Sequence, residues 1–272
     1  MKTEAVPHPL ELIAWYAEAG VTEALDETPH NHFADAPPAA TERAALPPAR
    51  AQPPQRAAAP VRAMPAAATT PDEAQVSALA LAREATSLDE LKAAMARFEG
   101  CALKATAKSL VFADGNPAGR LMLVGEAPGA EEDRLGLPFV GKSGQLLDRM
   151  LAAIGLTRAE HVYITNLLPW RPPGNRTPTP QEVAICMPFV QRHIELVNPD
   201  ILVCVGAPSA QALLGLAGIL ASRGKWMEYD TGARKIRAMA TLHPAYLLRQ
   251  PLQKRLAWRD LRALKAALDA TT

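Results

Sequence analysis

The amino-acid sequence predicts an α/β fold built on a mostly parallel, four-stranded sheet with helices on both faces. From about residue 81, short apolar runs alternate with segments in which apolar residues recur every three or four positions. A strand–helix–strand order needs crossover connections, which make neighbouring strands parallel and place helices against the sheet. These two observations set the fold class before any motif is considered.

The first helix of this body is predicted to start after Ser87. Ser87 and Glu90 have the spacing of a capping box, and apolar residues follow at helical intervals up to Gly100. The later elements, in chain order, are a strand at 121–124, a helix at 144–154, a strand at 162–165, a helix at 179–197, a strand at 201–205, a helix at 207–216, a strand at 237–242 and a helix at 258–268.

Two segments precede the body. Residues 1–36 carry apolar side chains at the spacing of a short amphipathic helix, which we expect to pack on the body or, alternatively, to bind a partner. Residues 37–80 are rich in alanine and proline, and such a stretch cannot bury enough apolar surface to offset its ordering entropy. The sequence therefore predicts an N-terminal segment, a flexible linker and a body spanning 81–272.

Composition and charge exclude several protein classes. No apolar run is long enough to cross a membrane, and the N-terminus lacks the order of regions typical of a signal peptide. The three cysteines lie far apart, which argues against a disulfide framework and favours a reducing compartment. We therefore expect a cytoplasmic monomer without a membrane partner. The formal charge is −5 over residues 1–80 and +6 over the rest, which suits DNA without being specific for it.

Polar residues follow the ends of the predicted strands. The first strand runs into Gly125-Glu126-Ala127, the second into Asn166 and the last into His243. Because ligands of parallel α/β sheets bind beyond the carboxyl ends of the strands, a carboxylate, an amide and an imidazole should converge at one edge. Singly, each residue has an ordinary structural explanation as a cap, a turn residue or a packed histidine. Together they favour a composite site.

Four segments resemble the motif series of family-four uracil-DNA glycosylases: GEAPGAEED (125–133), LPFVGKSGQLLDRML (137–151), VYITNLLPWRPPGNRTPTPQE (162–182) and LHPAYLLR (242–249). The resemblance covers about residues 98–268, with the motifs in the family's order and spacing. It implies a three-layer α/β/α fold and hydrolysis of the N-glycosidic bond of uracil in single- or double-stranded DNA, a step of base excision repair. Family-five relatives have an apolar residue where Glu126 stands, so the carboxylate favours family four.

The resemblance also implies residue roles. Glu126 would position the attacking water, Asn166 would read the polar edge of a flipped uracil, and His243 would help the uracil O2 accept negative charge. Phe139 would stack on the base, and Leu247 would fill the gap that the base leaves in the DNA. The other expected contacts are from Gly125 and Ala127 to the substrate and from Lys142, Arg171, Arg176 and Arg249 to DNA phosphates.

One departure from the family concerns its four-iron, four-sulfur cluster, which is held by four cysteines. Cys101 and Cys186 match two of these positions, but Phe98 and Trp170 stand at the other two. Two thiolates cannot hold a cubane that normally needs four. We therefore expect no cluster, metal or other cofactor. Cys204 lies within a predicted strand and is expected to be a small core residue.

Three alternatives remain open from the sequence. The chain could be a glycosylase of the same superfamily with a different or broader range of damaged bases. It could also be a non-catalytic DNA-binding relative that kept the pocket, or an enzyme of small molecules on a similar sheet. Assays on DNA duplexes that each carry one modified base distinguish these readings.

Overall fold

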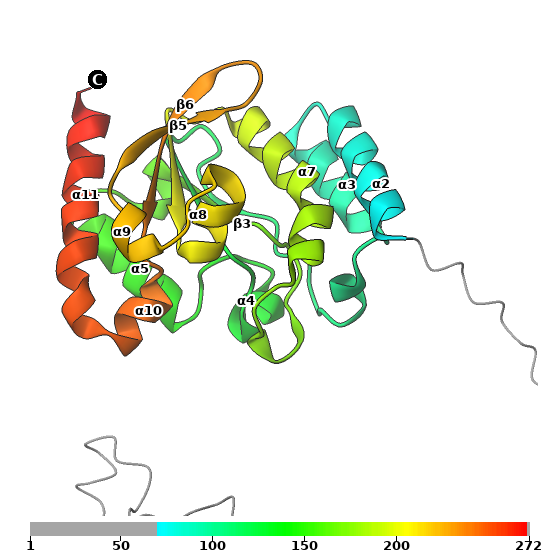
Figure 1. Cartoon of the computed structure of the whole chain (residues 1–272), viewed down its shortest axis with the longest axis horizontal. Coiled ribbons are helices and arrows are strands. Elements are labelled where there is room, and N and C mark those ends of the chain that lie inside the picture. Colours follow the sequence, from blue (N-terminus) through cyan, green and yellow to red (C-terminus); the bar gives the residue numbers. More distant parts are fainter. Residues whose placement is uncertain (1–69, 271–272) are drawn as a thin grey trace, which may run out of the picture. The chain divides into compact units, whose positions relative to one another are not determined.

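The computed structural model describes residues 70–270, so the predicted N-terminal segment and most of the predicted linker lie outside the described residues. The strands form one sheet, and helices pack around it (Figure 1). The strands are β1 (Asp114–Gly115), β2 (Leu121–Gly125), β3 (Val162–Asn166), β4 (Ile201–Val205), β5 (Trp226–Asp230) and β6 (Lys235–Thr241). The helices are α2 (Pro71–Glu84), α3 (Leu88–Arg97), α4 (Ala130–Leu135), α5 (Lys142–Ala152), α6 (Arg158–His161), α7 (Pro180–Val197), α8 (Ala207–Leu214), α9 (Ile219–Ser222), α10 (Pro244–Arg249) and α11 (Lys254–Asp269), with 3-10 turns η1 (Ala102–Ala105), η2 (Pro173–Asn175) and η3 (Pro251–Gln253).

The sheet has the strand order β1-β3-β2-β4-β6-β5. The four predicted strands are β3, β2, β4 and β6, and they pair in parallel, which confirms the central sheet. The count of four was too low, because an antiparallel strand borders each edge. β1 has only two residues, and β5 (WMEYD) is a half-exposed edge strand without a run of buried residues. Neither gives the apolar signal of a central strand.

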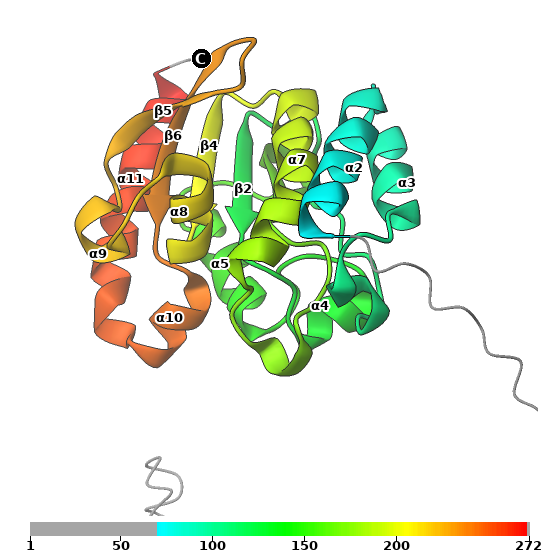
Figure 2. The same cartoon turned by 45° about the vertical axis from the view of Figure 1, so that its right-hand side comes forward.

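Alternate residues of the central strands face opposite helical layers. On β2, Leu121 and Leu123 belong to one core with α5 and α11, whereas Met122 and Val124 belong to another with α7, α2 and α3. Figure 2 shows α11 on one side of the sheet and α7 on the other, with α2 and α3 beyond α7. The three-layer α/β/α arrangement is thereby confirmed. No helix in the described part of the chain is both long and apolar enough to cross a bilayer.

The folded body begins earlier than the sequence analysis expected. Helix α2 starts at Pro71, inside the range assigned to the linker, and Thr70 with Glu73 forms a capping box at its first turn. Its buried residues are Ala74, Ala78 and Ala82, in a core that α7 shares. Alanines four residues apart form a narrow stripe that permits close helix packing. The same alanines resembled low-complexity linker composition, which explains the error.

The strand register brings the strand ends to one edge. Gly125 at the end of β2 pairs with Asn166 at the end of β3, and Val205 at the end of β4 pairs with Thr241 at the end of β6. The crossover from β2 to β3 passes through α5, while that from β3 to β4 passes through α7 on the opposite face. The chain therefore reverses its winding beside β2, where α/β sheets form ligand sites.

Candidate active site

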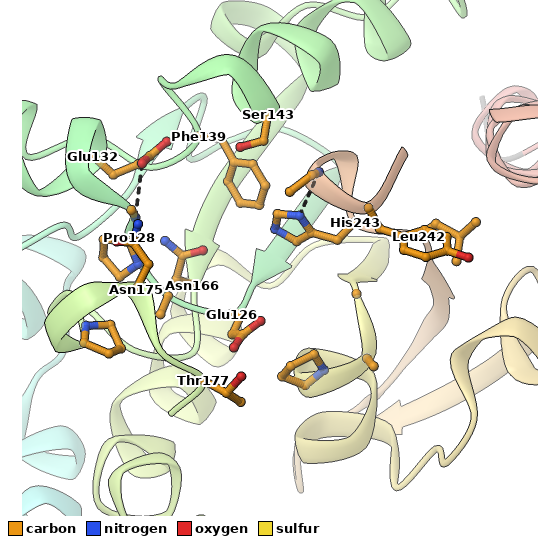
Figure 3. A pocket seen from close by; sticks show the side chains of 18 of the residues that line it. Glu126, Pro128, Glu132, Phe139, Ser143, Asn166, Asn175, Thr177, Leu242 and His243 are labelled. Atoms are coloured by element: carbon orange, nitrogen blue, oxygen red, sulfur yellow. Dashed lines mark hydrogen bonds between the residues drawn. The ribbon is translucent and has the colours of Figure 1, made fainter. Parts of the chain in front are cut away.

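A cavity opens at the carboxyl edge of the parallel strands. Its volume is about 630 Å³, within the range of ligand sites in proteins, and its walls come from the segments after β2, β3, β4 and β6 (Figure 3). Glu126, Phe139, Asn166 and His243 all line it. The expectation that a carboxylate, an amide and an imidazole meet at this edge agrees with the geometry.

Asn166 presents an unused amide to the cavity. It is the last residue of β3 and only 6% exposed, yet its side chain makes no hydrogen bond within the described part of the chain. No side-chain polar atom of the described residues is both fully buried and without a partner, so the Asn166 amide is open to the cavity, where a ligand can hydrogen-bond it. Gly125 lies beside it: a Cβ at Gly125 would collide with the Asn166 amide oxygen and with the Phe139 ring. Gly125 itself does not line the cavity, whereas Ala127 does.

His243 is held as a neutral hydrogen-bond donor. It is the N-cap of α10, and its Nδ1 accepts a hydrogen bond from the Ala245 N–H at 3.1 Å. Burial, with a smaller contribution from the positive charge of Arg249, lowers the pKa of His243 to about 4. At neutral pH the ring is therefore uncharged and carries its proton on Nε2. The Phe139 ring stacks on it, with centroids 5.4 Å apart.

Glu126 is one of two glutamates that line the cavity, the other being Glu132. It follows β2 directly, is half-buried, and its carboxylate has no hydrogen-bond or ion-pair partner among residues 70–270. Burial raises the pKa of this carboxyl above its ordinary value. A carboxylate in this state is available to hold a water molecule or to face a developing positive charge.

Phe139 adopts a backbone conformation that is rare for a bulky residue. Its φ is 53°, in the left-handed region, and such outliers persist only where the surroundings fix them. Glu132 fixes one side: its buried carboxylate accepts hydrogen bonds from the N–H groups of Val140 (3.0 Å) and Gly141 (2.9 Å). A Cβ at Gly144 would overlap the Phe139 carbonyl, so the close approach of α5 needs glycine there.

Arg158 fixes the other side of this loop. Its guanidinium donates to the carbonyls of Pro138 (2.8 Å) and Phe139 (2.7 Å), and it also pairs with Asp114 and Asp148. The sequence analysis gave no role to Glu132 or Arg158. Glu132 stands at a capping-box position that could have indicated a structural carboxylate. Arg158 gave no such signal, because its partners are distant in the chain.

Replacing Arg158 with methionine should misplace Phe139. We expect kcat/KM of the reaction at this site to fall about 10- to 100-fold, because small displacements of positioning groups cost rate steeply. Steady-state kinetics together with a thermal unfolding curve check this. Arg134→Met is the matched control, since Arg134 is an exposed arginine whose one partner among residues 70–270 is Glu131, on the same helix. A loss of similar size in both variants would contradict the positioning role.

Two of the four basic residues expected to contact phosphates are engaged within the protein. Arg176 lines the cavity but forms an ion pair with Glu182, whose pKa this pairing lowers to about 2. Arg171 donates a hydrogen bond within its own loop. Arg249 lines the cavity and Lys142 starts α5, and both are exposed and without partners among the described residues. Lys142 and Arg249 are therefore the two without any partner among the described residues, while Arg171 keeps its charge and its remaining donors and Arg176 is neutralised by Glu182.

Leu247 does not occupy the position expected for a side chain that enters DNA. It is 0% exposed and packs with Leu242 and Ala257. Residues 244 and 247 lie on the same, inward face of α10, as the helical period dictates. The exposed apolar residue of this helix is the next one, Leu248, which is 44% exposed. The assignment of Leu247 as the gap-filling residue was therefore wrong.

The cysteines do not present a four-thiolate site. The sulfurs of Cys101 and Cys186 lie 4.0 Å apart and are buried, while the rings of Phe98 and Trp170 stack in the same core with centroids 6.4 Å apart. Residues 70–270 contain no group of three or more side chains placed to hold a metal. The residues present thus do not fit a cubane cluster. Cys204 is fully buried in β4, as expected of a core residue.

Comparison with known proteins agrees with this geometry. Residues 112–262 match the model of the uracil DNA glycosylase superfamily. The chain is 41% identical to the type-4 uracil-DNA glycosylase of Archaeoglobus fulgidus over 170 residues, 61% of this chain and 85% of that protein. It is 39% identical to the type-4 enzyme of Thermotoga maritima (61% and 86% covered) and 36% identical to that of Saccharolobus solfataricus (68% and 88%). The chain therefore belongs to the uracil-DNA glycosylase superfamily and resembles its type-4 members.

Proposed function

We propose that this DNA glycosylase excises uracil from DNA by hydrolysing the bond between uracil N1 and the deoxyribose C1′, which leaves an abasic site for base excision repair. The observation that carries the proposal is the Asn166 amide, which has no partner among the described residues and is open to the cavity beside the Phe139 ring and the His243 imidazole. The family membership supports the same activity.

Recognition of the base rests on Asn166 and Phe139. An amide offers one acceptor and two donors, so Asn166 can accept from uracil N3–H and donate to uracil O4. Cytosine presents the reversed pattern, and the mismatch would leave buried polar groups unpaired. Phe139 provides a stacking surface, which contributes about 1–3 kcal/mol per base. Base flipping is required first, since the glycosidic bond of a stacked nucleotide is out of reach.

His243 and Glu126 would act on opposite sides of the breaking bond, His243 on the base and Glu126 on the sugar and the attacking water. As the C1′–N1 bond breaks, its electron pair moves to the base, and the Nε2–H of neutral His243 can donate to the uracil O2 that becomes negative. The sugar becomes positively charged, and the Glu126 carboxylate stabilises it while orienting a water molecule. The water oxygen then bonds to C1′ and loses a proton, and the uracil anion gains one. Interactions that strengthen only in this transition state raise kcat.

The DNA contacts differ from those first expected. We assign the gap-filling role to Leu248, because it is the exposed apolar side chain of α10 and follows the buried Leu247. Arg249, at the rim of the cavity, and Lys142 would pair with phosphates close to the flipped nucleotide. We also propose a cytoplasmic monomer, in keeping with three free cysteines.

A panel of oligonucleotides tests the proposal. Each would carry one uracil, hypoxanthine, mismatched thymine or no modification, in single and double strands, and alkali would cut the abasic product. We expect cleavage of uracil substrates in both forms and none of unmodified DNA. Stronger cleavage of another base would favour the broader glycosylase alternative. Binding without any cleavage would favour the non-catalytic one, and binding of small molecules alone would overturn both.

The pH dependence of kcat/KM should reflect the protonation of the Glu126 carboxylate. Because burial raises its pKa, the carboxylate is protonated at a higher pH than an ordinary glutamate, and kcat/KM should fall as the pH drops through that raised pKa. His243, with a pKa of about 4, should add no decline above pH 5. In Glu126→Gln the maximal rate of the pH profile should drop about 10²-fold, and the fall in rate that Glu126 protonation causes in the wild type should disappear. Single-turnover rates between pH 4 and 9 measure this, and an unchanged profile in the variant would contradict it.

A further inference from the structure

One face of α11 is a strip of positive charge that the active site does not use. The opposite face of the helix is buried through Ala257, Leu261 and Leu264, which pack on the sheet and on α5. The residues of the strip are all exposed, and we call them the basic face of α11: Lys254, Arg255, Trp258, Arg259 and Arg262.

The four cations of this face have no partners within the described residues. Several other arginines of the body pair with carboxylates, whereas Arg83, Arg97 and Arg249 resemble the basic face in having no partner among the described residues; the paired ones are Arg120, Arg134, Arg158, Arg176, Arg192 and Arg223. α11 has two acidic residues: Asp260 is 2% exposed and already bound by Arg223 and Thr241, and Asp269, at the far end of the helix, pairs with Lys265. The charge of the basic face is therefore not compensated locally, and it is available to an anionic partner.

The basic face continues from the rim of the cavity. His243 caps α10, Arg249 at the end of α10 lines the cavity, and η3 leads directly into α11. Figures 1 and 2 show α11 starting beside α10 and running away along the outer side of the sheet. Arg255, Arg259 and Arg262 follow one another at helical spacing over about 10 Å. Trp258 stands between them, 43% exposed, an aromatic side chain suited to sugars and bases.

We propose that the basic face of α11 binds the phosphate backbone of the DNA that flanks the flipped uracil. This inference rests on the proposed function, because it uses the cavity as the place where the DNA is held. DNA fits better than another anion for two reasons. The strip follows the cavity-lining Arg249 in the chain after the short η3 turn, and its length of about 10 Å matches two to three phosphates rather than a single anion. The contacts would add affinity without touching the reacting atoms.

The test compares two triple variants of the full chain with equal charge changes. One is Arg255→Gln, Arg259→Gln and Arg262→Gln. The control is Arg83→Gln, Lys92→Gln and Arg97→Gln, which removes three exposed, unpartnered cations from α2 and α3 at the other end of the described body. The probe is a uracil-free 20-base-pair duplex, whose binding is measured at several salt concentrations. Uracil excision is measured separately, at saturating enzyme in a single turnover.

For the α11 variant we expect the slope of log K against log salt to become less negative by about 0.9 per lost phosphate contact, two or three units in all. The control should keep the wild-type slope, and the single-turnover rate should stay unchanged in both. Among single variants the effect should decrease from Arg255 to Arg262, with distance from the cavity. Equal slopes in the two triple variants would overturn the proposal, and would point to a protein partner for this face if binding to DNA is otherwise normal. Absence of uracil excision in the wild type would refute the proposed function without changing the binding result.

Discussion

Replacing Asn166 with alanine is expected to lower kcat/KM for uracil excision by about 10³-fold or more. Asn166 is 6% exposed at the end of β3, and its amide faces the cavity without a partner among the described residues, so no protein group compensates for its loss. Sites built to hydrogen-bond a polar edge lose discrimination by 10⁴–10⁵-fold when the pairing is removed, and single donors in such sites contribute about 10²–10³-fold. Single-turnover excision from a uracil-containing duplex measures the effect.

Asn166→Asp separates hydrogen bonding from shape. The aspartate has nearly the same size but only accepts when ionised, so it would repel uracil O4 and should be as damaging as alanine. Asn175→Ala is the matched control: Asn175 also lines the cavity, but it is exposed and its side chain is bonded to Arg171. Unchanged excision by Asn166→Ala, or equal losses at Asn166 and Asn175, would remove the basis of base recognition proposed here.

The central sheet could be predicted because its strands are short runs of buried apolar residues. Each residue of β2 and β4 is buried, so the sequence there contains no exposed position to obscure the pattern. β5 and α2 were missed for opposite reasons. β5 is a short, partly exposed edge strand with two acidic residues and no run of buried apolar residues, whereas α2 buries only alanines, which carry little apolar signal.

The site was predictable where residues follow strand ends and unpredictable where they meet through the fold. Glu126, Asn166 and His243 lie directly after β2, at the end of β3 and after β6, so the parallel register alone brings them together. Arg158 supports Phe139 although helix α5 lies between them in the chain, and no local sequence pattern indicates this contact. The gap-filling role was given to the wrong residue, Leu247, because a position in a motif does not show which side of the helix faces the core. That information came from the packing of α10 against Leu242 and Ala257.

Replacing His243 with alanine should reduce kcat about 10²–10³-fold, equivalent to about 3–4 kcal/mol of transition-state stabilisation, while KM changes little. The reason is the fixed tautomer: Ala245 N–H occupies Nδ1, and burial keeps the ring neutral, so Nε2–H is left to meet charge that appears on the base only as the bond breaks. Single-turnover kinetics at saturating enzyme isolate this step. His161→Ala is the control, since His161 is 41% exposed on α6 and lies outside the cavity lining.

The leaving group makes this prediction specific. 5-Fluorouracil leaves as a more stable anion than uracil, because fluorine withdraws electrons from the ring. If His243 acts by stabilising the departing anion, His243→Ala should lose several-fold less rate with 5-fluorouracil than with uracil, whereas Glu126→Gln should lose about the same with both. A mere packing role for His243 would instead lower the unfolding temperature and reduce both rates equally. Equal losses for the two bases in His243→Ala would therefore contradict charge stabilisation by the imidazole, even if the overall loss were as large as expected.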